Sequence, residues 1–283
     1  MHARSALFDL YGDHLRRMAG DEPGSPTQAP VAALVRLLGP LGLQPPAVRT
    51  AVSRMVRQGW LQAVRLDAGP GYALTPRAAR RVDAAAERIY RTSAPAWDGR
   101  WHLVLVHPPI TVRAERERLH ASLAFEGYGP LGGAAWVAPR PAAELDAVLA
   151  EAGIRAERFT AEHDGDSQLL ASRAWDLDGL TRSYTRFLAE QQEALAAADT
   201  STDEGAFAAR SVLVHEYRKF LFVDPDLPLA LLPADWPGTK ASSWFGEQAA
   251  MLLPAARRFI ASCLHPESPS VLLPPLAAPP TEG

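Results

Sequence analysis

The apolar positions of the first forty residues predict two helices joined by a loop. Arg4–Met18 has apolar residues at helical spacing. Gly20–Pro30 is rich in proline and glycine, which indicates a loop. Val31–Leu38 predicts a short helix, and Gly39 and Pro40 end it.

The next segment, Leu43–Leu61, predicts an amphipathic helix with a basic face. Its apolar residues recur at i, i+3, i+4, i+7 and i+8, at Val48, Ala51, Val52, Met55 and Val56. Pro45 and Pro46 suit a first helical turn, and Gly59 suits the helix end. The remaining surface is polar or basic and includes Arg49, Thr50, Ser53, Arg54 and Arg57. Such a helix, Pro46–Gln58, fits the major groove of DNA, because arginine pairs with guanine edges and with phosphates.

A hairpin and a further helix follow the basic helix. Trp60–Leu66 alternates apolar and polar residues as a strand does, Asp67–Gly71 predicts a turn, and Tyr72–Leu74 predicts the returning strand. Arg65 lies near the tip of this hairpin, where it could contact phosphate. Thr75 and Pro76 suit the start of a helix that continues to about Arg91.

These elements occur in the order of a winged helix-turn-helix DNA-binding domain, which we predict over residues 1–94. Arg49, Ser53 and Arg54 are the candidates for base contacts. Thr50, Arg57 and Arg65 are the candidates for phosphate contacts. The alternative is a generic helical bundle with an exposed basic helix.

The middle of the chain predicts a ferredoxin-like domain over residues 95–170. The predicted elements are a strand at Trp101–Val106, a helix at Arg113–Phe125, a strand at Ala134–Ala138, a helix from Pro141 to Gly153 and a weaker strand at Ile154–Ala161. Strands and helices in this order are typical of that fold, although one strand is not placed.

Two catalytic interpretations of this domain fail on the sequence. Gly127–Gly132 matches GxGxxG, but it follows a helix and contains Pro130, so we predict a plain turn and no dinucleotide site. A related metal-dependent nuclease would need a carboxylate after the first strand. Here His107, Pro108 and Pro109 follow that strand.

Residues 171–264 predict a helical domain, so the whole chain is expected to be α+β. The first helix has an apolar face with Leu180, Tyr184, Phe187, Leu188, Gln191 and Leu195. Asp203 is expected to cap the second helix, and Asp224-Pro225 to end it. The third spans about Lys240–Cys263, with a kink at Pro254. Residues 265–283 are proline-rich and are expected to be a disordered tail.

Composition and charge add to this picture. The chain is 47% hydrophobic and 22% charged, without an apolar run long enough for a membrane helix and without a signal-peptide pattern, so a cytoplasmic protein is expected. Residues 1–95 carry 13 arginines and 7 carboxylates, whereas the remainder carries 16 basic and 25 acidic residues. This basic N-terminal part favours a polyanionic partner.

No catalytic site emerges from the sequence. There is no GxSxG motif, and the single Cys263 excludes an internal disulfide and a cysteine-based zinc site. His215-Glu216 is not a zinc-protease motif, because Lys219 stands in place of the second histidine. We therefore predict a protein that is not an enzyme and holds neither metal nor resident cofactor.

Several segments resemble the PaaX-like family of transcriptional repressors, which regulate phenylacetate degradation. They are Ala6–Arg16, Val48–Leu61, Tyr72–Ala78, Trp97–Val104, Val212–Phe220 and Asp224–Gly238. The resemblance implies a winged-helix domain, a middle ferredoxin-like domain akin to a small CRISPR-associated endonuclease, and a helical C-terminal domain. It also implies a homodimer that binds double-stranded operator DNA with an inverted repeat. Family members are typically released from DNA by an aryl-acyl-coenzyme A such as phenylacetyl-CoA.

An aryl-acyl-CoA would need an aromatic slot and cationic groups for its phosphates. The candidate effector-binding residues are Trp175, Tyr184, His215, Arg218, Lys219 and Trp236. Each of the aromatic residues is equally compatible with a place in the hydrophobic core. The alternative function is an acyl-CoA-binding or CoA-ester-metabolising protein that uses its winged-helix domain for protein contacts.

Overall fold

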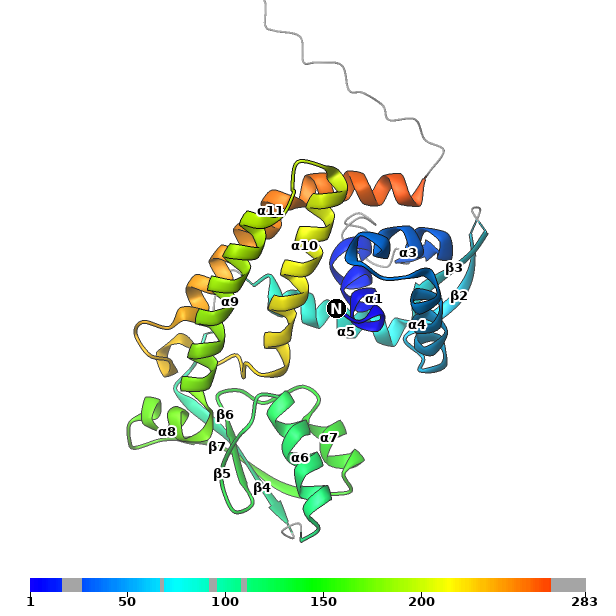
Figure 1. Ribbon diagram of the computed structural model, residues 1–283. Helices are drawn as coiled ribbons and strands as arrows, with labels where there is room; N and C mark the ends of the chain where they lie inside the picture. The colour runs from blue at the N-terminus through cyan, green and yellow to red at the C-terminus, as the bar shows by residue number, and fades with distance from the viewer. Residues whose placement is uncertain (17–26, 67–68, 92–95, 108–110, 266–283) are drawn as a thin grey trace, which may run out of the picture.

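The computed structural model describes residues 1–16, 27–66, 69–91, 96–107 and 111–265. Figure 1 shows three parts: a compact N-terminal part around α1, α3 and α4, a sheet with two helices, and a group of long helices that contacts both. The expected turn at Asp67–Gly71 lies partly outside the described residues. The predicted tail lies outside them except for His265.

The N-terminal part consists of short helices and a three-stranded sheet. Its elements are α1 (Ala3–Asp9), the π-helix η1 (Leu10–Leu15), β1 (Gln28–Pro30), α3 (Val31–Leu38), the 3-10 turn η2 (Gly39–Leu41), α4 (Pro45–Arg57), β2 (Leu61–Leu66), β3 (Gly69–Leu74) and α5 (Pro76–Ile89). The strands are antiparallel in the order β1-β3-β2.

The sequence predicted most of these elements and was wrong in three places. β1 lies within the segment predicted as a loop, because it pairs only with the distant β3. β3 begins at Gly69, three residues earlier than expected. The first helix widens into a π-helix from Leu10 onward, which residue periodicity does not reveal. The predicted cap of α5 is confirmed, since the Thr75 hydroxyl accepts a hydrogen bond from the Ala78 amide at 3.3 Å.

The middle part is a four-stranded antiparallel sheet with two helices on one face. It contains β4 (Arg100–His107), α6 (Arg113–Phe125), β5 (Gly129–Gly132), β6 (Ala135–Ala138), α7 (Leu145–Glu151) and β7 (Arg155–Glu162), with strand order β5-β6-β4-β7. This βαββαβ order agrees with the ferredoxin-like prediction.

The unplaced strand is β5, and it lies where we predicted a plain turn. Gly129 and Pro130 pair with Val137 and Trp136 of β6. A glycine is needed there because a Cβ on Gly129 would lie 2.8 Å from the carbonyl oxygen of Ala174. Gly129 therefore serves packing between β5 and α8.

The third part is built from helices. These are α8 (Ser167–Ala174), α9 (Leu177–Ala197), α10 (Asp203–Arg218), the 3-10 turns η3 (Lys219–Phe222) and η4 (Leu229–Leu231), and α11 (Pro237–Leu264). The sequence did not predict α8. Thr202, not Asp203, caps α10, with its hydroxyl 3.0 Å from the Gly205 amide. Pro254 lies inside α11, as expected.

The hydrophobic core of the N-terminal part extends into the C-terminal helices. Its buried cluster of α1, α3, α4 and α5 residues is completed by Phe207 of α10 and by Ala256, Ile260 and Cys263 of α11. At the other end, Ile89 of α5 belongs to the buried cluster of α9, α10 and α11. The two parts are therefore packed as one unit, although the sequence predicted a domain boundary near residue 94.

Among the helices of the described residues, none combines the length and the hydropathy that a membrane span requires.

Candidate functional sites

The first candidate site is the exposed face of α4. Val48, Ala51, Val52 and Met55 are buried, as the apolar spacing predicted. The five polar residues singled out on this helix are all exposed: Arg49, Thr50, Ser53, Arg54 and Arg57. These positions fall within one side of a helix that is about 20 Å long, so three arginines and two hydroxyl residues share its accessible face.

Aromatic contacts hold α4 and the start of the hairpin against α1. The Phe8 ring meets the Trp60 ring edge to face, with centroids 4.8 Å apart. The guanidinium of Arg4 lies 5.7 Å from the Phe8 centroid, and that of Arg81 lies 5.9 Å from the Trp60 centroid. Sequence analysis selected neither Arg4, which lies one turn before Phe8 on α1, nor Arg81, which reaches Trp60 from α5.

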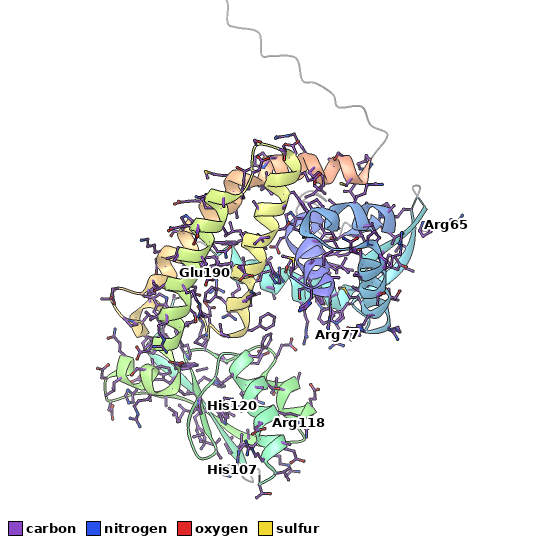
Figure 2. All side chains as sticks on the ribbon, in the orientation of Figure 1. Arg65, Arg77, His107, Arg118, His120 and Glu190 are labelled. Carbon is purple, nitrogen blue, oxygen red and sulfur yellow. The ribbon has the colours of Figure 1, made fainter. Side chains whose placement is uncertain are left out.

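The hairpin β2–β3 projects beside α4 and carries Arg65. Arg65 is exposed and pairs in register with Pro70, and Figure 2 shows it on the outer side of the hairpin. The hydroxyl of Tyr11 donates to the carbonyl oxygen of Tyr72 at 2.8 Å, which ties the hairpin to η1. α4 and the hairpin are thus both fixed to the α1–η1 helix.

A buried polar network joins the α1–η1 helix to α10. Asp13 is fully buried and receives the Arg218 guanidinium at 2.7 Å and the Tyr90 hydroxyl at 2.9 Å. Asp9 lies 3.1 Å from Arg218 and 2.7 Å from Nδ1 of His215. Burial raises the pKa of Asp9, and its hydrogen bond to His215 opposes that effect.

The network continues through Arg210, which is fully buried. Arg210 donates to the Ala249 carbonyl oxygen at 3.1 Å and to the Tyr90 hydroxyl at 3.2 Å. His14 lies between Arg210, at 3.3 Å, and the Ser211 hydroxyl, at 3.0 Å. Tyr90, directly after α5, therefore connects both halves of this network.

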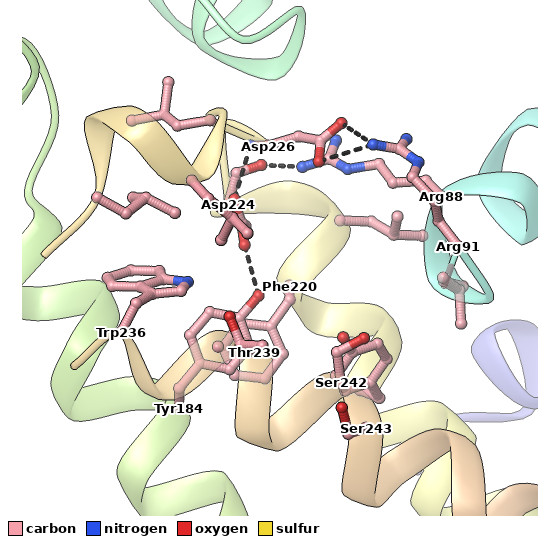
Figure 3. Close-up of a pocket in the computed structure, with 17 residues that line it drawn as sticks. Arg88, Arg91, Tyr184, Phe220, Asp224, Asp226, Trp236, Thr239, Ser242 and Ser243 are labelled. Atoms are coloured by element: carbon pink, nitrogen blue, oxygen red, sulfur yellow. Dashed lines mark hydrogen bonds and ion pairs between the residues drawn. The ribbon is translucent and has the colours of Figure 1, made fainter. Parts of the chain in front are cut away.

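The second candidate site is a pocket of about 400 Å³ where the end of α5 meets α9, η3 and α11. Its wall is largely aromatic and aliphatic, with Tyr184, Tyr217, Phe220, Leu221, Leu227, Leu229, Leu232 and Trp236. Its polar residues are Arg88, Arg91, Asp224, Asp226, Thr239, Ser242 and Ser243. Figure 3 shows the aromatic side chains on one side and the arginine–aspartate pairs along the rim. A volume in this range is typical of small-molecule sites.

Hydrogen bonds arrange the floor of the pocket. The Tyr184 hydroxyl donates to the Asp224 carboxylate, and Arg88 donates to the Asp224 carbonyl oxygen. The Tyr184 ring stacks on Phe220 with centroids 3.9 Å apart and 5° between planes. Burial raises the pKa of the Asp224 carboxyl and of the Tyr184 hydroxyl, which favours the uncharged form of both groups.

The structure divides the six candidate effector residues among four places. Tyr184 and Trp236 line the pocket together. Trp175 stacks on Trp101 in a separate aromatic cluster, with centroids 6.2 Å apart.

The three polar candidates lie outside the pocket. His215 and Arg218 belong to the buried network, and Lys219 is exposed and pairs with Glu216 at 2.6 Å. Sequence proximity placed them with Tyr184, but they lie on another face of α10 and η3. The arginines that do line the pocket, Arg88 and Arg91, come from the N-terminal part, and no local sequence pattern links them to Trp236.

Within the described residues, no three His, Cys, Asp or Glu side chains come close enough to hold a metal ion.

Three family models match consecutive parts of the chain. The model of the PaaX-like protein matches residues 2–78, that of the PaaX protein central Cas2-like domain matches 94–171, and that of the PaaX-like protein C-terminal domain matches 175–262. The chain is 30% identical over 270 residues to the transcriptional repressor PaaX of Escherichia coli strain K12, covering 90% of this chain and 82% of that protein.

The chain is also similar to a solved structure over nearly its whole length. That structure is of an uncharacterized protein, Rv0674, from Mycobacterium tuberculosis, with 28% sequence identity and a TM-score of 0.61. The match covers 92% of this chain and 99% of that one.

Proposed function

Because this chain belongs to the PaaX-like family, we propose that it is a DNA-binding transcriptional repressor with an N-terminal winged helix-turn-helix domain. The observation that carries the proposal is α4, which buries four apolar side chains and exposes Arg49, Ser53 and Arg54 on one accessible face. In this domain type the second helix enters the major groove and its exposed side chains contact base edges. α3, η2 and α4 supply the helix-turn-helix, and β2–β3 supplies the wing.

The roles of the individual side chains follow from their positions. We assign base contacts to Arg49, Ser53 and Arg54. Thr50 and Arg57 on α4, and Arg65 on the wing, are assigned to phosphate, where charge contributes affinity without reading sequence.

We further propose that the protein acts as a homodimer on an inverted repeat. A single recognition helix reads only a few base pairs, and a twofold-symmetric dimer places two such helices in successive major grooves. Half-sites separated by about one helical turn, roughly 34–36 Å, are the expected spacing.

An aryl-acyl-CoA such as phenylacetyl-CoA is the proposed effector, and the pocket beside Tyr184 and Trp236 is its proposed site. The aromatic wall suits an aryl group, and the polar rim suits a thioester and the arm that follows it. Coenzyme A is large for a pocket of about 400 Å³, so its adenosine would lie outside, and its pyrophosphate is the anionic group that would meet the arginines at the rim. The proposed target is an aromatic-acid catabolic pathway.

Fluorescence anisotropy on the protein's own upstream promoter DNA tests the proposal. We expect binding that is tighter than to random DNA, falls steeply between about 50 and 200 mM salt because counterions are released, and is reversed by phenylacetyl-CoA. Unesterified coenzyme A is the control for the aryl group.

The outcomes separate the parts of the proposal. Tight binding that phenylacetyl-CoA does not reverse would retain the repressor and reject this effector. Binding no stronger than to random DNA would reject the repressor and favour a CoA-ester-binding protein that uses its winged helix for protein contacts.

A further inference from the structure

We propose that Asp226 is a ligand-responsive latch: the anionic part of a bound ligand displaces the Asp226 carboxylate from Arg91 and thereby loosens the junction between the pocket and the N-terminal part. The ligand class is a molecule with an apolar aromatic body and a negatively charged group. This inference rests on the proposed function, since it names how the effector site is regulated.

Asp226 connects all three parts of the chain. Its carboxylate lies 2.8 Å from Nη1 of Arg91, two residues beyond the end of α5. Arg140, which follows β6, donates to the Asp226 carbonyl oxygen at 2.7 Å and lies 3.5 Å from its carboxylate. Asp226 itself lies between η3 and η4 of the helical part. Loss of this one carboxylate therefore affects contacts among the three parts at once.

The backbone at Asp226 is held in an unfavourable conformation. Its φ is +58°, and among the described residues it is the only non-glycine residue with positive φ. Such a conformation persists only where the surroundings enforce it. The Asp226 amide donates to the Asp224 carboxylate at 2.6 Å and its carbonyl oxygen accepts from Arg140 at 2.7 Å, so contacts on both sides of the residue hold this conformation.

An anion is the ligand that this arrangement favours. Arginine stays charged, whereas the Asp226 side chain is 29% exposed and can turn toward water. A second donor is available, because Nη1 of Arg140 is buried without a hydrogen-bond partner among the described residues. An anionic group could therefore replace the Asp226 carboxylate, while a cation would have to displace the arginines.

The same segment leads to the DNA-facing helices. Arg88, Ile89 and Arg91 line the pocket, and Tyr90 lies between them with its hydroxyl on Asp13. Asp13 belongs to η1, which continues α1, and residues of α1 pack in the same core as α4. Movement of the 88–91 segment would therefore shift the α1–η1 helix, against which α4 packs.

The first experiment needs no ligand. Amide hydrogen exchange is compared for the wild-type protein, Asp226→Asn and Asp146→Asn. Asparagine tolerates the left-handed conformation, so the first variant keeps the fold. Asp146 also pairs with an arginine, Arg158, but on the exposed surface of the middle part, which makes it a matched control. We expect faster exchange in residues 10–15 and 86–91 for Asp226→Asn alone. Exchange identical to the wild-type protein would overturn the latch, whatever the protein does with DNA.

The second experiment titrates phenylacetyl-CoA into each protein bound to its promoter DNA. Asp226→Asn removes the competing carboxylate, so release should occur at an about three- to fivefold lower concentration, as expected for one partly exposed ion pair. Arg91→Gln removes the anion's partner and should raise that concentration about tenfold. Release of both variants at the wild-type concentration would overturn the latch while leaving the proposed function intact. If the wild-type protein does not bind its promoter DNA but Asp226→Asn still exchanges faster in residues 10–15 and 86–91, the proposed function is rejected and the latch is retained.

Discussion

Arg54 is exposed on the basic face of α4, opposite the buried side chains of that helix. If it pairs with a guanine edge, Arg54→Ala should weaken operator binding by about 1–3 kcal/mol and leave binding to random DNA nearly unchanged. Competition anisotropy with operator and random duplexes measures both quantities. Arg116→Ala is the control, since Arg116 is also exposed but lies on α6 of the middle part. An equal loss on both duplexes would make Arg54 a phosphate contact.

The buried carboxylate of Asp13 attaches the N-terminal helix to α10 and to the end of α5. It has no exposed surface, and Arg218 and Tyr90 both bind its carboxylate. Asp13→Ala leaves part of the Arg218 charge buried without compensation, which should lower the free energy of unfolding by about 3–5 kcal/mol. Urea denaturation of the full chain measures the loss.

The control for Asp13 is an ion pair of similar composition on the surface. Arg258 contacts Asp203 at 2.6 Å but is 63% exposed. Arg258→Ala should therefore shift the urea midpoint very little, because water already solvates both charges. Equal losses in the two variants would contradict the proposed role of the buried network.

At the scale of elements, β5 depends on close packing against α8. A Cβ on Gly129 would lie 2.8 Å from the Ala174 carbonyl oxygen and 2.7 Å from Cε2 of Trp175. We expect Gly129→Ala to destabilise the protein by about 1–3 kcal/mol, because backbone atoms must move to admit the methyl group.

Gly246→Ala is the matched control substitution, since no atom lies within 4 Å of a Cβ there. It should stabilise α11 by about 0.5–1 kcal/mol. Thermal unfolding of the two variants should therefore shift in opposite directions.

Elements with a strong local pattern were predictable from the sequence. The buried stripe of α4, the Thr75 cap and the exposure of Arg49 and Arg54 all follow from residue spacing and type. β1 and β5 could not be found this way, because each short strand is stabilised by hydrogen bonds to a partner distant in sequence. Neither strand has the alternation that a longer one shows.

The pocket was less predictable than the basic helix for the same reason. Aromatic content indicated Tyr184 and Trp236, but Arg88 and Arg91 reach them only after α5 packs on the helical part. His215 and Arg218 were selected for their charge. Their carboxylate partners, Asp9 and Asp13, lie about two hundred residues earlier in the chain.

At the scale of the whole molecule, the N-terminal part relies on the C-terminal helices. Phe207, Ala256, Ile260 and Cys263 complete its core, and Arg218 neutralises Asp13. A fragment of residues 1–94 should therefore lack a cooperative thermal transition, whereas the full chain should unfold cooperatively. Circular dichroism against temperature distinguishes the two. A fragment that melts as sharply as the full chain would contradict the shared core.

Helix α11 has a consequence for how such proteins can be recombined. Its first turns line the pocket through Thr239 and Ser242, and its last turns supply Ala256 and Ile260 to the core beneath the basic helix. A chimera that exchanges only the first ninety residues with a relative would place a foreign surface against those last turns. Functional hybrids should require that α10 and residues 249–264 are exchanged together with the N-terminal segment, so that a change of DNA specificity needs replacements in distant stretches of the gene.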